Sequence, residues 1–199
     1  MIANMNSATA VSIVSGTWLA WVVGWIALAG WRKPARRRAG AGIEVGHRII
    51  QIAGALLIFA APERWHWLGG PMLPITPPLL FAGIGLLWAG VALSFWARAI
   101  LGGNWSATVE VKVEHELIRR GPYARVRHPI YSGILLALLG TVLVFDRWRA
   151  LLGFALIGIA LTIKARGEER LLIQPFGARY AEYMKATGRF LPRLRVRRA

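Results

Sequence analysis

With 199 residues, 56% of them hydrophobic, a mean hydropathy of +0.47 and only 17% charged residues, the chain is too apolar for an ordinary soluble domain. Its net charge of +16 would suit a nucleic-acid binder, but the basic residues lie between apolar blocks and at the C-terminus, where the positive-inside rule and anionic lipids account for them. The absence of cysteine excludes disulfides, thiolate metal sites and a cysteine nucleophile. We therefore expect one integral membrane domain over residues 1–199, with membrane lipids and no nucleic acid as partners.

The first half of the chain holds three long apolar segments. Residues 8–31 exceed the core of a signal peptide, about 7–15 residues, and no basic stretch precedes them, so they predict a retained transmembrane helix. The second segment, 43–61, is polar in its first turns, and we expect these turns at an interface or inside the bundle. After a proline-rich loop at 71–78, the third segment, 79–101, is again long enough to span.

Two shorter apolar segments follow, 130–145 and 148–163, separated only by Asp146 and Arg147. Such a short connection requires an antiparallel helical hairpin. Small residues at four-residue spacing permit close helix packing in the first and fourth segments, although they equally fit plain apolar filler: Gly16, Ala20 and Gly24, then Gly133, Ala137 and Thr141.

The basic residues are distributed asymmetrically along the chain. Of the 25 Lys and Arg, 22 lie in residues 32–48, 98–127 and 164–198, and three lie in the alternate loops. The positive-inside rule then predicts five spans in the plasma (inner) membrane, with the N-terminus outside and the C-terminus in the cytoplasm. The expected fold is an all-α integral membrane protein with five transmembrane helices, a cytoplasmic cap and a C-terminal amphipathic helix.

The most informative motif is Arg127-His128-Pro-Ile-Tyr131-Ser-Gly133, which stands at the start of the fourth segment. Going up one helix and down the next, at 1.5 Å per residue, returns the chain to the same membrane face at Glu168. We therefore expect His128 and Glu168 to be neighbours. Upstream, alternating valines at 109–113 predict a short extended segment, and a Gly-Pro turn brings Tyr123 close to the motif.

These residues resemble the isoprenylcysteine carboxyl methyltransferases and the related membrane phospholipid methyltransferases, and the sequence looks like a prokaryotic member. The resemblance covers residues 98–193 and is carried by the motif at 127–133, by Glu168-Glu169, by Phe176-Gly-Ala-Arg-Tyr-Ala-Glu-Tyr183 and by Thr187-Gly-Arg-Phe-Leu-Pro192. The upstream Gly103-Asn-Trp-Ser106 and His115-Glu-Leu-Ile118 add to it. The first three spans match only in hydropathy.

What the resemblance implies is a site for S-adenosyl-L-methionine at the cytoplasmic face, in the catalytic region 102–193. Paired charges suit the amino-acid part of this cofactor, and an aromatic ring suits its sulfonium. The resemblance assigns the following residues to it: His115, Glu116, Leu117, Ile118, Tyr123, His128, Pro129, Ile130, Tyr131 and Glu168. It also implies a basic residue before the glutamates that meets an anionic substrate, and both Lys164 and Arg166 fit this role.

The expected reaction is direct methyl transfer to the carboxylate of an isoprenylcysteine-like lipid that enters from the bilayer. An ionised carboxylate needs no general base, whereas an amine would, and Glu169 is then the candidate base. We place Lys164, Arg166 and Glu169 in the catalytic set on these grounds. No histidine spacing typical of a metal site is present, so we expect no metal.

Several alternatives remain open at this point. A phospholipid amine or another small lipophilic molecule would serve as substrate of a related methyltransferase. An NADPH-dependent membrane reductase would share the Phe-Gly-x-x-Tyr helix, and a non-enzymatic lipid-binding protein would share the hairpin. Individually, His128 suits a polar interface, Pro129 a helix start, and Glu168-Glu169 the first turn of a helix.

Overall fold

The computed structural model describes residues 6–30, 35–38, 41–60, 66–105, 110–112 and 116–193. Long helices dominate it: α1 (Ser7–Ala29), α2 (Ala41–Phe59), α4 (Pro77–Leu101), α5 (Pro129–Phe145) and α6 (Trp148–Ala186). Shorter elements lie between them: β1 (Ala35–Arg38), α3 (His66–Gly69), η1 (Gly102–Asn104), β2 (Glu110–Lys112) and η2 (Gly121–Ala124). Each of the five expected apolar segments is therefore helical, and the first four helices have ends close to the predicted ones.

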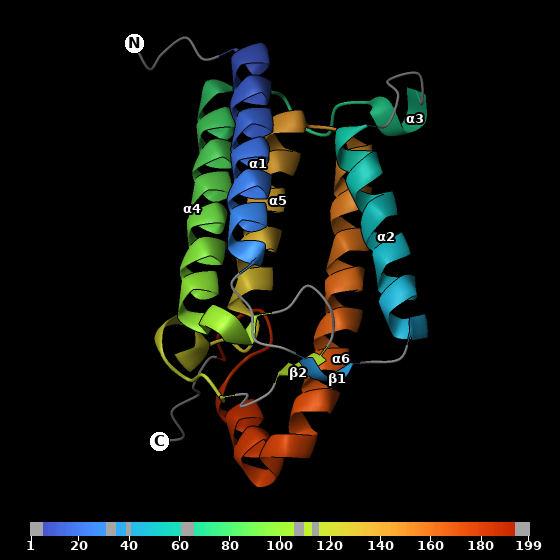
Figure 1. Cartoon of the computed structure of the whole chain (residues 1–199). Coiled ribbons are helices and arrows are strands. Elements are labelled where there is room, and N and C mark those ends of the chain that lie inside the picture. The colour runs from blue at the N-terminus through green and yellow to red at the C-terminus, as the bar shows by residue number, and fades with distance from the viewer. Residues whose placement is uncertain are drawn as a thin grey trace, which may run out of the picture.

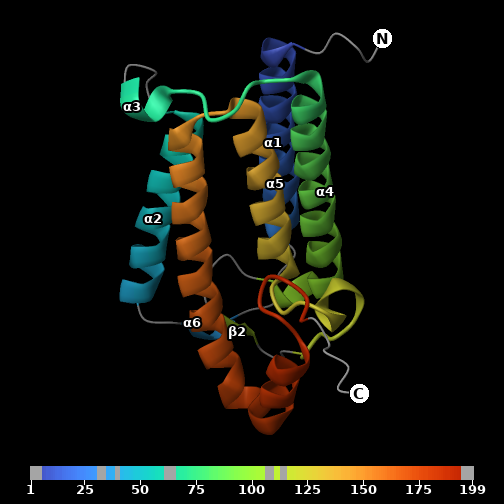
Figure 2. The same cartoon turned by 180° about the vertical axis from the view of Figure 1, so that it is seen from behind.

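The helices form two groups that stand side by side (Figures 1 and 2). In one group α1 and α5 lie along α4, and in the other α2 lies along α6. Glycines allow the close approaches: a Cβ on Gly133 of α5 would lie 2.6 Å from the carbonyl oxygen of Gly90 in α4, and one on Gly54 of α2 would lie 2.7 Å from that of Gly153 in α6. The close packing expected at Gly133 is thus confirmed, whereas nothing lies within 4 Å of a Cβ built on Gly16.

The hairpin between α5 and α6 turns at Asp146, as predicted. Asp146 adopts a left-handed backbone conformation with φ 49°, and its side chain accepts hydrogen bonds from the backbone N–H groups of Met72 and Leu73 at 3.1 and 2.9 Å. These bonds fasten the loop before α4 to the tip of the hairpin. The start of α5 and the far part of α6 consequently meet at the opposite end of the bundle (Figure 1).

Two expectations need correction. The fold is nearly all-helical rather than all-α, because β1 pairs antiparallel with β2; the extended segment predicted around residue 111 is real, but its partner lies some 75 positions away. Also, the last helix does not end at residue 163. It continues through the glutamates to Gly177, whose φ of 49° and ψ of −125° favour glycine and reverse the helix direction. The C-terminal helix is thus the far arm of α6.

Within the described residues, three helices are long and apolar enough to cross a membrane: Ser7–Ala29, Pro77–Asn104 and Trp148–Ala186. Helix α5 is apolar but has only 17 residues. The chain is therefore an α-helical membrane protein, and the arrangement of five spans stays a prediction.

Candidate functional site

The candidate site lies where the start of α5 meets the segment that follows α6. Backbone hydrogen bonds join these two segments. The N–H of Arg127 donates to the carbonyl of Gly188 at 2.9 Å, and the N–H of His128 donates to the carbonyl of Arg189 at 3.1 Å. The Ser132 hydroxyl adds a bond of 2.6 Å to the carbonyl of Phe190. The motif at 127–133 and the Thr-Gly-Arg-Phe motif at 187–190 are thus two halves of one structure.

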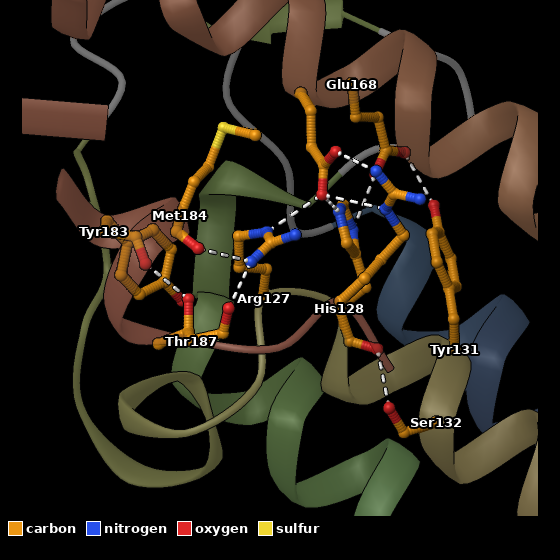
Figure 3. Close-up of polar contacts among 10 residues, drawn as sticks. Arg127, His128, Tyr131, Ser132, Glu168, Tyr183, Met184 and Thr187 are labelled. Atoms are coloured by element: carbon orange, nitrogen blue, oxygen red, sulfur yellow. Dashed lines mark hydrogen bonds and ion pairs between the residues drawn. The ribbon is translucent and has the colours of Figure 1, made fainter. Parts of the chain in front are cut away.

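Glu169 is the centre of a buried ion-paired network in this structure. Its carboxylate accepts from Arg127 Nε at 2.9 Å and from Arg189 Nη2 at 2.7 Å, and His128 Nε2 lies 3.3 Å away. Arg127 also donates to the carbonyls of Met184 and Thr187 (Figure 3). Burial opposes ionisation, but the bonds from His128, Arg189 and Arg127 outweigh it and hold the pKa of Glu169 far below its ordinary value.

Glu168 forms a second set of contacts on the other side of His128 (Figure 3). The Tyr131 hydroxyl donates to Glu168 Oε1 at 2.6 Å, and His128 Nδ1 lies 3.3 Å from Oε2. The His128 and Tyr131 rings stack with centroids 5.4 Å apart. The expectation that His128 and Glu168 are neighbours is therefore confirmed.

The two glutamates raise the pKa of His128. Burial lowers the pKa of His128, but its hydrogen bonds to Glu168 and Glu169 outweigh burial and leave the pKa raised. The pKa of Glu168 is lowered, because its bonds to His128 and the nearby Lys164 charge outweigh burial. These groups lie beyond the apolar segments 130–145 and 148–163.

A pocket opens beside this network and holds about 790 Å³ when its mouth is included. Eight of the predicted cofactor residues line the pocket: Glu116, Leu117, Ile118, Tyr123, His128, Ile130, Tyr131 and Glu168. Pro129 is buried without lining it, and His115 lies outside the described residues.

The three residues of the predicted catalytic set occupy different environments. Lys164 is buried, with its Nζ 5.5 Å from the centre of the Tyr131 ring, whereas Arg166 is exposed. Glu169 does not line the pocket, and both of its oxygens are used in the network. None of the three lines the pocket: Lys164 lies against the pocket residue Tyr131, and Glu169 is held in the arginine pairs.

Seven pocket residues were not in the predicted site: Leu101, Asn104, Trp105, Arg127, Leu172, Tyr180 and Tyr183. Most belong to motifs that carried the family resemblance, which was the available signal. The sequence could not predict that Tyr180 and Tyr183 line the pocket, because they follow the change of helix direction at Gly177. Among the described residues, no group of three or more His, Cys, Asp or Glu could hold a metal ion.

Fold and site together define an α-helical membrane protein with an ion-paired pocket at one end of its apolar helices. Residues 83–174 match the isoprenylcysteine carboxyl methyltransferase (ICMT) family. This region of the chain is thus similar to that family, as its motifs indicated.

Three other proteins are similar to this chain in sequence. YpbQ, an uncharacterised protein of Bacillus subtilis, is 28% identical over 61% of this chain and 64% of its own length. The cobalt-zinc-cadmium resistance protein CzcN of Cupriavidus metallidurans is 34% identical over 78% of this chain and 66% of its own. The protein-S-isoprenylcysteine O-methyltransferase of Schizosaccharomyces pombe is 31% identical over 56% and 48%.

A solved structure has a similar fold. The eukaryotic intramembrane Ras methyltransferase ICMT superposes with a TM-score of 0.52 at 22% identity, covering 74% of this chain and 52% of that one. The chain thus spans about two thirds or less of the length of the proteins it matches.

Proposed function

We propose that the chain transfers a methyl group from S-adenosyl-L-methionine to the carboxylate of an isoprenylcysteine-like lipid at the cytoplasmic face of the membrane. The observation that carries this proposal is the pocket bordered by His128, Tyr131 and Glu168 within the ICMT-family region. The name of the Schizosaccharomyces pombe relative supports the carboxyl substrate.

The residues present fit the cofactor. A carboxylate at Glu168, itself held by Tyr131 and His128, suits an ammonium group or ribose hydroxyls, and the aromatic rings of Tyr123 and Tyr131 suit a sulfonium. Glu116, Leu117, Ile118 and Ile130 complete the wall, and His115 and Pro129 remain assigned by resemblance alone. When bound, the cofactor would supply an electrophilic methyl group on a sulfonium.

The chain's own contribution is then positioning and exclusion of water. A carboxylate substrate is already ionised near neutral pH, because carboxyl groups ordinarily have a pKa near 4. An amine substrate must lose a proton, and the two glutamates are poor bases, since their hydrogen bonds hold the pKa of each below its ordinary value. The proton chemistry of the site therefore favours the carboxyl substrate over a phospholipid amine.

Lys164 is the residue we propose for docking the substrate anion. It is buried four residues before Glu168 on α6, with its Nζ 5.5 Å from the centre of the Tyr131 ring, and Tyr131 lines the pocket. Arg166, the other candidate from the sequence, is exposed. We also keep the proposal of five spans with the basic segments in the cytoplasm, which agrees with β1, β2, η2 and the far arm of α6 lying at one end of the bundle (Figure 1).

Purified protein in lipid nanodiscs, given cofactor with a labelled methyl group, a farnesylated cysteine acid and phosphatidylethanolamine, tests this function. We expect label in the farnesylated acid, as a base-labile ester. Label only in the amine lipid would contradict the carboxyl substrate and return Glu169 to the role of general base. Binding of NADPH without binding of S-adenosylhomocysteine would indicate the reductase instead.

A further inference from the structure

Asn104 stands in the wall of the pocket, and the oxygen of its side-chain amide is buried. The residue ends η1, is 8% exposed and lines the pocket. Across the described part of the chain, its buried Oδ1 accepts no hydrogen bond. Buried polar atoms are nearly always paired in folded proteins, so an exception in a pocket wall points to a ligand.

The backbone around Asn104 is held by other groups. Arg98, itself almost fully buried, donates to the carbonyl of Gly102 at 2.8 Å and to that of Leu28 at 2.7 Å. Its guanidinium also lies 4.7 Å from the Trp105 ring centre. Asparagines in turns commonly bond to nearby backbone, but here Arg98 fixes the turn and leaves the Asn104 amide to the pocket.

The neighbours of this amide suit a flat heterocycle. Leu101, Trp105 and Ile118 contribute apolar and aromatic wall to the same pocket. The Trp105 ring also makes an edge contact with the Trp25 ring, with ring centres 5.9 Å apart. A primary amide among such walls can accept from the exocyclic amine of adenine and donate to its N7, which is how asparagine pairs with adenine; in the inosyl analogue both of these positions are acceptors.

We propose that Asn104 recognises the amino-bearing edge of the adenine base of the bound cofactor. This assignment rests on the proposed function, because it requires an adenosyl ligand in the pocket. It makes Asn104 a specificity residue, which selects the base while Glu168 and its partners select the charged end. Orientation of the amide is set by the ligand, since its oxygen and nitrogen can exchange places by a flip of the side chain.

Calorimetric titration with S-adenosylhomocysteine and its inosyl analogue, in which a carbonyl replaces the exocyclic amine, tests the proposal without turnover. We expect the wild-type protein to prefer the adenosyl ligand by about 5- to 150-fold, the range of one good asparagine–adenine pair. Asn104→Leu, which keeps the branched shape but has no polar atom, should reduce this preference to near unity. Asn104→Asp, which keeps an acceptor, should retain it.

Thr162→Val serves as the control, because the Thr162 hydroxyl bonds only within its own helix, to Gly158 at 2.8 Å, among the contacts of the described residues. An unchanged preference in Asn104→Leu would overturn the assignment, and equal binding of both ligands by the wild type would do the same. If Asn104→Leu does not fold, loss of the preference in Asn104→Asp contradicts the proposal. Failure of the wild type to bind either ligand would instead refute the proposed function, and the assignment with it.

Discussion

His128 and Glu168 stand forty positions apart in the sequence, and His128 Nδ1 lies 3.3 Å from Glu168 Oε2 at the wall of the pocket. Glu168 also accepts from the Tyr131 hydroxyl, so its carboxylate is held in a fixed orientation on the pocket side of the site. Glu169, the next residue, faces the arginines instead. Consecutive glutamates on one helix therefore have different surroundings: the first lines the pocket, and the second pairs with the arginines.

Replacing Glu168 should weaken cofactor binding with little effect on folding. Glu168→Gln removes the negative charge but keeps the shape, and a hydrogen bond to a charged group contributes about 1.5–3 kcal/mol, or about 10- to 150-fold in affinity. Titration with S-adenosylhomocysteine measures the loss. A folded Glu168→Gln protein with wild-type affinity would show that the carboxylate does not contact the ligand.

Replacing Glu169 should instead destabilise the protein. Glu169→Gln leaves the buried Arg127 and the partly buried Arg189 without their counter-charge, and breaking a buried pair in this way costs about 3–5 kcal/mol. Thermal unfolding in detergent measures the change. Glu182→Gln is the matched control, because Glu182 is an exposed carboxylate on the same helix, and equal unfolding temperatures for the two variants would contradict the network's role.

The same network predicts how stability depends on pH. Because the folded-state pKa of Glu169 is lowered, its contribution is fully present above its unfolded pKa of about 4.3 and is lost as the pH falls through the folded value. His128 has the opposite sign: its pKa is raised, so its contribution is present below about 6.5 and lost as the pH rises through the folded value. The stability difference between wild type and Glu169→Gln should therefore shrink on acidification below about pH 4, and a constant difference down to pH 2 would refute this.

Lys164 and Arg166 provide a matched pair for the substrate site. Lys164→Met should raise the KM for a lipid acid by about tenfold or more, because loss of one desolvated charge contact costs 1.4 kcal/mol or more. Arg166→Met should leave KM within about twofold, since Arg166 is exposed. Steady-state kinetics with a farnesylated cysteine acid distinguish the two, and a larger effect at Arg166 would reverse the assignment.

The close approach of α4 and α5 predicts a sensitive glycine. Gly133→Ala places a Cβ 2.6 Å from the Gly90 carbonyl oxygen and 2.7 Å from the Ser94 nitrogen, so the helices must separate, at a cost of about 1–3 kcal/mol. Gly85→Ala is the control on α4, because nothing lies within 4 Å of its Cβ. The unfolding temperature should fall for Gly133→Ala and not for Gly85→Ala. Equal unfolding temperatures for the two variants would mean that α4 and α5 do not pack as described.

Membrane topology can be tested with single cysteines, because the native chain has none. In the five-span arrangement, Gly42→Cys and Leu191→Cys react with an impermeant thiol reagent from the cytoplasmic side, and Gly70→Cys reacts from the other side. Labelling is measured in right-side-out and inverted vesicles. Reaction of Gly70→Cys from the same side as Gly42→Cys would contradict the five-span proposal.

The sequence by itself determined the helices, the family and most of the pocket wall, because apolar length and local motifs depend on neighbouring residues only. It also predicted that His128 and Glu168 meet, since helix rise and a two-residue turn leave little freedom for the hairpin. The tertiary structure alone decided that Glu169 pairs with Arg127 and Arg189, that Lys164 rather than Arg166 is buried, and that β1 pairs with β2. These features depend on the rotation of α6 about its axis and on the reversal at Gly177, which are set by packing between residues far apart in the chain.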